Sequence, residues 1–248
     1  MSLWVVAVAA LLAGFVKSSI GVGGGILPLA LLATFVQVPL AVATLGPVQL
    51  VSSLGAVTSG REYVAWSEVV RMVPAALLGL AAGTFLLVEM PAPWLTLGLG
   101  IFALAIGLRM VLRAKSTQVV IHNAPTGWPR SIAATTFGLL GGVMSGVAHS
   151  GGLVMTVYLS AVHLDKKAFV ATLMTVVCAV DIAKLFAYST SGLLPENWIM
   201  VILVSIPAVI VGTNVGRRAN HRMSPEFFRS VLGIVVILLG VPLIVESL

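Results

Sequence analysis

Residues 17–28 read KSSIGVGGGILP, and residues 146–153 read GVAHSGGL. Both stretches interrupt long apolar runs with glycines and polar side chains. The apolar segments that begin there, 24–37 and 151–163, are shorter than the about 20 residues that a helix needs to span a bilayer. Short, glycine-interrupted segments at matching places in two halves of a chain point to a transporter binding site. The sequence therefore predicts two broken helical hairpins.

The composition is that of a membrane protein. Hydrophobic residues make up 59% of the 248 residues and charged residues only 9%, whereas soluble domains carry about 25% charged residues. Only helices and closed barrels span lipid, and the apolar runs lack the alternation of barrel strands. We therefore predict an all-α polytopic membrane protein. Its expected segments are 2–20, 24–37, 40–60, 69–89, 93–112, 131–147, 151–163, 168–190, 197–216 and 227–246.

Basic residues gather in one set of loops, which the positive-inside rule assigns to the cytoplasm. The other loops, 37–40, 89–93 and 191–197, carry at most one acidic residue each. With this assignment, residues 1–37 and 131–163 are hairpins that return to the side on which they start. Both termini are then expected outside the cytoplasm, and the two halves are inverted. The basic residues are Arg61, Arg71, Arg109, Arg113, Lys115, Arg130, Lys166, Lys167, Arg217, Arg218, Arg222 and Arg229.

An internal repeat relates the two halves. The break at 23–26 aligns with 150–153, and residues 42–45 align with 170–173. The second half has an insertion of four residues, about one helical turn, between Thr172 and Thr190. Equivalences inside that helix therefore stay open. We expect a first repeat at 1–113, a cytoplasmic linker at 114–130 and a second repeat at 131–248, each repeat a broken hairpin plus three transmembrane helices. The later matches are Trp66 with Trp198, Pro74 with Pro207, Gly79 with Gly212, Gly83 with Gly216, Gly100 with Gly233 and Gly107 with Gly240.

Over essentially its whole length the chain resembles the sulfite exporter TauE/SafE family. The resemblance implies a bacterial plasma-membrane exporter of small sulfur-containing anions such as sulfite or organosulfonates. In two places the chain departs from the family pattern: His149 stands within the second break, and Leu45 and Leu173 stand where a serine often follows the threonine. The resemblance is carried by the glycine-rich break at 21–25 with Pro28, the Val-Ala-Thr segment at 42–44, Gly60, Trp66, Pro74, Gly79 and Gly83, which the second half echoes.

The two breaks are the expected anion site. A helix N-terminus carries partial positive charge and unpaired N–H groups, which bind anions. Under inverted symmetry the two short helices would both begin near the membrane midplane and face each other. The alternative is that the glycines only allow close helix packing. The substrate-binding residues expected at the breaks are Gly23, Gly24, Gly25, Ser150, Gly151 and Gly152.

Lys17 and Lys184 are the two basic residues outside the basic loops. A charge at membrane depth is expensive and usually has a function or a partner. Lys17 lies one turn before the first break, where it could supply charge to an anion or, alternatively, extend to the interface. Lys184 lies three residues after Asp181 on one helix face. Asp181 and Lys184 could form a structural ion pair, or Asp181 could accept a proton that is coupled to transport.

An unperturbed histidine has a pKa of about 6.5, so His149 could bind the anion, relay a proton or be purely structural. Hydroxyl and amide side chains could donate to substrate oxygens, although each is also an ordinary polar residue of helix packing. The first choices for substrate binding are Ser18, Ser19, Gln49, Ser52 and Thr175, and the further candidates are Ser53, Thr44, Ser145, Thr172 and Asn214.

Two other classes of function are weighed against an anion transporter. A cation transporter could use Asp181 and His149, but a fixed charge on Lys17 would repel cations. An intramembrane enzyme lacks support, since the sequence has no His-Glu-x-x-His zinc pattern and no Gly-x-Ser-x-Gly nucleophile turn near His149. We expect no cofactor, no metal and no nucleic acid. The expected partners are a small anion and the lipid bilayer, and the sequence leaves the oligomeric state open.

Overall fold

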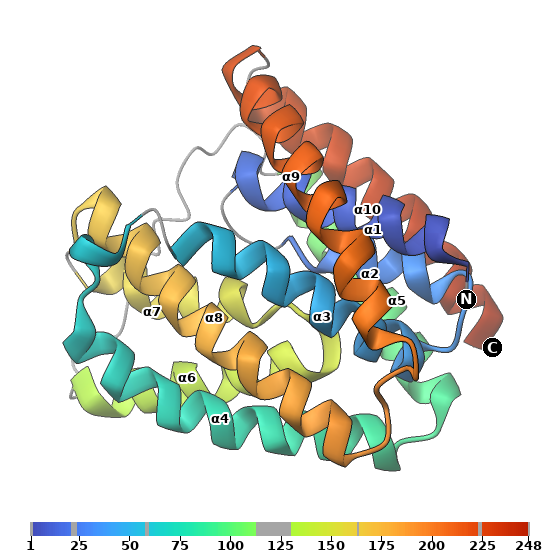
Figure 1. Ribbon diagram of the computed structural model, residues 1–248, viewed down its shortest axis with the longest axis horizontal. Helices are drawn as coiled ribbons and strands as arrows, with labels where there is room; N and C mark the ends of the chain where they lie inside the picture. The colour runs from blue at the N-terminus through green and yellow to red at the C-terminus, as the bar shows by residue number, and fades with distance from the viewer. Residues whose placement is uncertain are drawn as a thin grey trace.

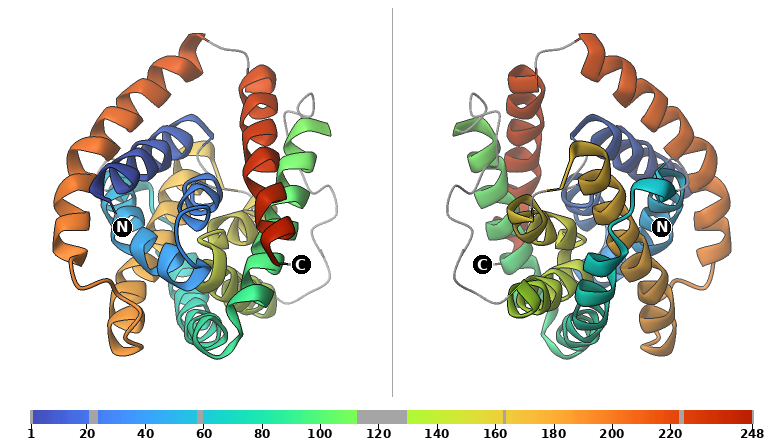
Figure 2. Two further views of the ribbon diagram at one scale, coloured as in Figure 1. Left: turned by 90° about the vertical axis from the view of Figure 1, so that its right-hand side faces the viewer. Right: turned by 90° about the vertical axis from the view of Figure 1, so that its left-hand side faces the viewer.

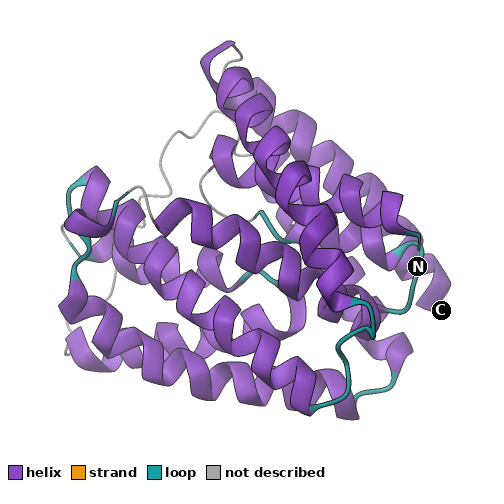
Figure 3. Ribbon diagram, in the orientation of Figure 1, coloured by secondary structure: helices purple, strands orange, loops and turns teal. Residues whose placement is uncertain are grey.

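The computed structural model describes residues 2–20, 24–57, 60–112, 130–162, 164–222 and 225–247. These residues form helices and connecting loops, without strands (Figure 3), which confirms the predicted all-α class. The helices are α1 (Leu3–Ile20), α2 (Ile26–Ala33), α3 (Val38–Val57), α4 (Trp66–Glu89), α5 (Ala92–Leu112), α6 (Arg130–Ala148), α7 (Gly151–Ala161), α8 (Lys166–Thr190), α9 (Trp198–Arg222) and α10 (Pro225–Ser247), with a 3-10 turn at Arg61–Tyr63.

Six of these helices are long and apolar enough to cross a membrane, counted over the described part of the chain. They are α3, α4, α5, α6, α8 and α9. The apolar segments Leu3–Ser18 and Ser230–Val245 belong to α1 and α10. The protein is therefore a multi-pass helical membrane protein, as its composition predicts. The linker predicted at 114–130 lies outside the described residues except for Arg130, which begins α6.

The two short segments form short helices beside the predicted breaks. The helix α2 has 8 residues and α7 has 11, too few to span a bilayer alone. Each follows a longer helix, α1 or α6, and packs against it. The two predicted hairpins are therefore present as α1–α2 and α6–α7.

Glycines bring the long helices into backbone contact. A Cβ on Gly142 of α6 would overlap the carbonyl of Ala76 in α4, and one on Gly79 of α4 would overlap the carbonyl of Leu139 in α6. The pair α1 and α9 meets in the same way, because a Cβ on Gly212 would overlap the carbonyl of Leu11. Small residues allow this close approach in lipid, where no hydrophobic effect drives helices together. Figure 1 shows α4 beside α6 and α1 beside α9.

The contact of α5 with α10 supports the predicted repeat. A Cβ on Gly107 would lie 2.7 Å from the carbonyl of Gly233, and one on Gly100 would lie 3.1 Å from the carbonyl of Gly240. These glycines are the ones that the repeat pairs, Gly100 with Gly233 and Gly107 with Gly240, and they touch crosswise. The later glycine of α5 contacts the earlier glycine of α10, and the earlier glycine of α5 contacts the later one. These two equivalent helices therefore run antiparallel (Figure 2). Antiparallel equivalents are what an inverted repeat requires, although inversion across the membrane stays a prediction.

The ends of the chain lie toward the same side of the molecule as two of the charge-poor loops (Figure 1). In Figure 1 the start of α1, the end of α10 and the α4–α5 and α8–α9 loops lie toward the right, and the turn Arg61–Tyr63 and the start of α8 lie toward the left. The basic turn at Arg61–Tyr63 and the basic start of α8 thus lie toward a different side from the α4–α5 and α8–α9 loops (Figure 1). The assignment of the basic side to the cytoplasm remains a prediction of the positive-inside rule.

The close packing of α4 on α6 predicts a large difference between two glycine substitutions. We expect Gly142→Ala to lower the free energy of unfolding by about 1–3 kcal/mol, because the new methyl group must push two backbones apart. Gly98→Ala is the matched control, since a Cβ there meets nothing within 4 Å. Thermal unfolding in detergent, followed by circular dichroism, should show a lower melting temperature for Gly142→Ala alone. Equal melting temperatures for both variants would contradict the packing argument.

Candidate functional site

The two breaks meet in the middle of the molecule. A Cβ on Gly25 would overlap the carbonyl of His149, so the two turns are in backbone contact. Leu153, in the first turn of α7, packs against the apolar cluster that contains Ile26 and Leu27 of α2. The beginnings of the two short helices are therefore neighbours, which supports the predicted arrangement. Gly23 lies outside the described residues.

The charged end of Lys17 lies beside the first break without a hydrogen-bond partner. Its Nζ atom is shielded from solvent and has no hydrogen-bond partner, and a Cβ on Gly24 would lie 3.0 Å from the Cβ of Lys17. The side chain therefore ends inside the protein and does not extend toward an interface. A buried ammonium group without a hydrogen-bond partner is costly and usually serves a function.

Asp181 and Lys184 form the predicted ion pair on α8. The Lys184 Nζ lies 2.8 Å from the Asp181 Oδ1, and both side chains are almost completely buried. The Ser53 hydroxyl donates to the Asp181 Oδ2 at 2.8 Å and so ties α3 to α8. The carboxylate is thus bonded at both oxygens, and the pair carries no net charge. The alternative role of Asp181, as a proton acceptor, is not tested by this geometry.

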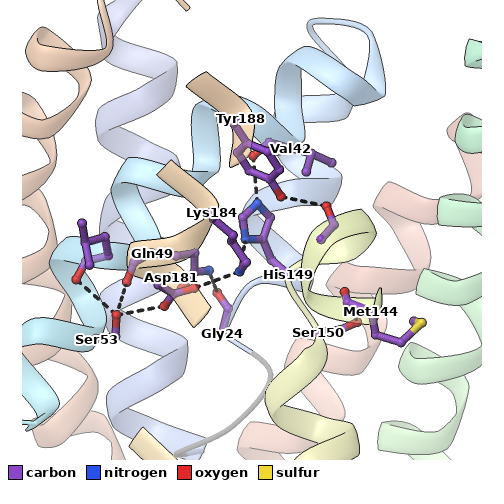
Figure 4. A network of polar contacts seen from close by, with 12 residues as sticks. Gly24, Val42, Gln49, Ser53, Met144, His149, Ser150, Asp181, Lys184 and Tyr188 are labelled. Atoms are coloured by element: carbon purple, nitrogen blue, oxygen red, sulfur yellow. Dashed lines mark hydrogen bonds and ion pairs between the residues drawn. The ribbon is translucent and has the colours of Figure 1, made fainter. Parts of the chain in front are cut away.

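His149 links the second break to α3 and α8 (Figure 4). Its Nε2 lies 2.8 Å from the carbonyl of Val42 and its Nδ1 lies 3.1 Å from the Lys184 Nζ. A carbonyl only accepts and an ammonium only donates. The contacts therefore select the neutral ring with its proton on Nε2. Both nitrogens are occupied in this state, so substrate binding or proton relay by His149 stays a prediction that requires a change of partners.

The backbone at His149 adopts a conformation that is more usual for glycine. His149 has a φ of 49°, the only positive φ of a non-glycine residue in the described part of the chain. This left-handed conformation is strained for a histidine unless its surroundings hold it. The two ring contacts supply that restraint. Tyr188 adds to it, since its hydroxyl donates to the carbonyl of Gly146 at 2.7 Å and its ring packs edge-on against His149.

The candidate hydroxyl and amide side chains fall into two groups. Gln49 is at the site, where its Nε2 donates to the carbonyl of Gly24 at 3.2 Å, and Ser52 and Thr44 are buried on the same helix. The others have partners elsewhere. Ser18, Ser150, Thr175 and Asn214 donate to backbone carbonyls of their own segments, and Thr172 accepts from the amide of Ala65. The side chain of Ser19 is outside the described residues.

The charges at the site leave one positive group unbalanced. Asp181 and Lys184 neutralise each other, and His149 is neutral in the geometry described above. Lys17 is the remaining charged side chain. The helices α2 and α7 begin at the two breaks that meet here, and the first amides of a helix have no partner within it. The arrangement favours an anion. The described residues include no group of three or more His, Cys, Asp and Glu that could hold a metal ion.

These features define a multi-pass helical membrane protein with two broken hairpins that meet at a buried, positively charged site. The family model described as sulfite exporter TauE/SafE matches residues 6–243. The chain therefore belongs to the TauE/SafE family, whose members are membrane transporters, and the resemblance seen in the sequence is confirmed. No curated protein and no solved structure matches the chain.

Proposed function

We propose that the protein exports small sulfur-containing anions, such as sulfite or organosulfonates, across the bacterial plasma membrane. The substrate is held at the two breaks, with Lys17 as its counter-charge. The two inverted halves then expose this site alternately to the cytoplasm and to the outside. The observation that carries the proposal is the buried, unpartnered Nζ of Lys17 beside two neighbouring helix N-termini.

The family favours sulfur-containing anions and export. Its description names sulfite, and the donors at the site suit sulfonate or sulfite oxygens, which only accept hydrogen bonds. A tetrahedral or pyramidal oxyanion can accept from the Lys17 ammonium and from the amides of both breaks at once. An inverted pair of halves permits movement in both directions, so the direction is taken from the family description, which names an exporter.

A cation transporter is the second candidate, because Asp181 is a buried carboxylate. Its two oxygens are already bonded to Lys184 and Ser53. A cation would also have to approach the unbalanced charge of Lys17. Both observations favour the anion.

The test is flux into proteoliposomes that contain the purified protein. Sulfite, sulfate, thiosulfate, small sulfonates and small carboxylates are offered one at a time, each with and without a proton gradient. Uptake of sodium and of potassium is measured as the cation control. We expect one sulfur oxyanion or sulfonate to move at least tenfold faster than the carboxylates. Uptake of a cation, or no anion uptake by folded protein, would contradict the proposal.

A further inference from the structure

A second polar cluster lies far from the two breaks, at the start of α4. Glu68 is completely buried and its carboxylate has three partners. Arg71 and Arg130 contact its Oε1 at 2.6 and 2.7 Å, and the Tyr158 hydroxyl donates to its Oε2 at 2.5 Å. We call these four residues the Glu68 cluster. In the sequence its arginines are topology signals, and no motif marks Glu68 or Tyr158.

The Glu68 cluster joins three helices at one end of the molecule. Glu68 and Arg71 belong to α4, Arg130 begins α6, and Tyr158 is in the last two turns of α7. This end carries basic loops, which the positive-inside rule assigns to the cytoplasm. The helix α7 runs from the second break toward this end. In the predicted topology it therefore lies between the proposed anion site and the cytoplasm. Its far end is tied to α4 by the bond from Tyr158 to Glu68.

The repeat gives no such cluster at the opposite end. By the alignment of the halves, Tyr158 corresponds to Leu31, Glu68 to Met200 and Arg130 to Leu3. All three counterparts are apolar, so they cannot form ion pairs or hydrogen bonds with their side chains. The ends of α2 and α7 are therefore held differently. A hydrogen bond to a buried carboxylate fixes α7, whereas α2 has only apolar side chains and cannot make such a bond.

We propose that the Glu68 cluster is a latch that keeps the cytoplasmic end of the transport route closed. The latch rests on the proposed alternating-access function, because the cytoplasmic route opens only when α7 separates from α4. Its asymmetry biases the empty protein toward the state that is closed to the cytoplasm. Arg71 and Arg130 are partly exposed, so water can solvate them when the latch opens, and Glu68 gains access to water at the same time.

The single cysteine of the chain is a native reporter of this opening. Cys178 is buried near the middle of α8, three residues before Asp181 of the site. A water-soluble maleimide therefore reaches it only when a water-filled route opens. Reagent added to inside-out or to right-side-out vesicles reports which side has opened, without any need to know the substrate.

The test compares Tyr158→Phe and Glu68→Gln with the wild-type protein. Tyr158→Phe removes only the hydroxyl, and Glu68→Gln keeps the shape of the side chain while it weakens both ion pairs. The matched control is Tyr63→Phe, at the same end, whose hydroxyl is exposed and has only a 3.4 Å contact with Lys167. We expect both latch variants to label Cys178 about tenfold faster from the cytoplasmic side, since loss of a hydrogen bond to a charged group shifts an equilibrium by that order.

The direction of the change decides the outcome. Labelling that rises from the cytoplasmic side only, with the Tyr63→Phe control unchanged, supports the latch even if no anion is ever found to move. Unchanged labelling in both latch variants, or a rise from both sides alike, overturns it. Anion flux that persists while labelling stays unchanged would leave the proposed function standing and remove the latch alone.

Discussion

Replacing Lys17 by glutamine is expected to lower anion flux at least about 100-fold. Two unit charges 4 Å apart interact by about 4 kcal/mol at an effective dielectric constant near 20. Each 1.4 kcal/mol is about a factor of ten. Glutamine retains hydrogen-bond donors but removes the charge that balances the substrate. Initial rates of uptake into proteoliposomes, at a substrate concentration below saturation, measure the effect.

The controls separate charge from general damage. Lys167→Gln removes a lysine from an exposed position near the start of α8, and its flux should stay within about twofold of wild type, because exposed charges interact weakly in water. Lys17→Arg keeps the charge, but Gly24 packs against the stem of this side chain, so it should retain part of the activity. Flux that is unchanged in Lys17→Gln would exclude Lys17 as the counter-charge.

The second large effect is on stability, at the ion pair of α8. Asp181→Asn is expected to lower the free energy of unfolding by about 3–5 kcal/mol, because it leaves the Lys184 ammonium buried without a counter-charge. The double variant Asp181→Asn/Lys184→Met removes both charges and should recover most of the loss. Recovery should be incomplete, since the Nδ1 of His149 then loses its donor. Thermal unfolding in detergent measures both variants.

Asp165→Asn is the matched control for this pair. Asp165 is exposed and caps α8 by accepting from the amide of Ala168 at 2.8 Å, and asparagine caps helices about as well. Its melting temperature should stay near that of wild type. If the double variant is as unstable as the single one, the loss does not come from an unpaired charge. If the stable double variant transports without responding to a proton gradient to which the wild type responds, Asp181 serves coupling as well as packing.

The fold follows from features that act locally along the sequence. Helix length, the glycine breaks and the loop charges are each readable from a short window, because lipid permits few backbone structures. The breaks before Ile26 and Gly151 and the pair of Asp181 with Lys184 are therefore predicted and found. Lys17 is singled out for the same reason, since a charge inside an apolar run stands out in any window.

The parts of the site that the sequence does not reveal depend on contacts between distant helices. The bond of His149 to Lys184 joins α6–α7 to α8, where the repeat alignment has its insertion. Tyr188 lies one turn after Lys184 on the same face of α8, which is a signal that could have identified it. Thr172 looked like a donor to substrate but accepts from Ala65, because a residue type alone does not tell which neighbour its helix face meets.

The central claim is that an anion binds at Lys17, and equilibrium binding tests it most directly. Isothermal titration of the purified, detergent-solubilised protein would compare a small sulfonate with an amine cation of matched size, in wild type and in Lys17→Gln. We expect the sulfonate to bind wild type and to lose at least about 100-fold in affinity in Lys17→Gln, while the cation binds neither. Binding of the cation to wild-type protein, or equal binding of the sulfonate to both, would contradict the account.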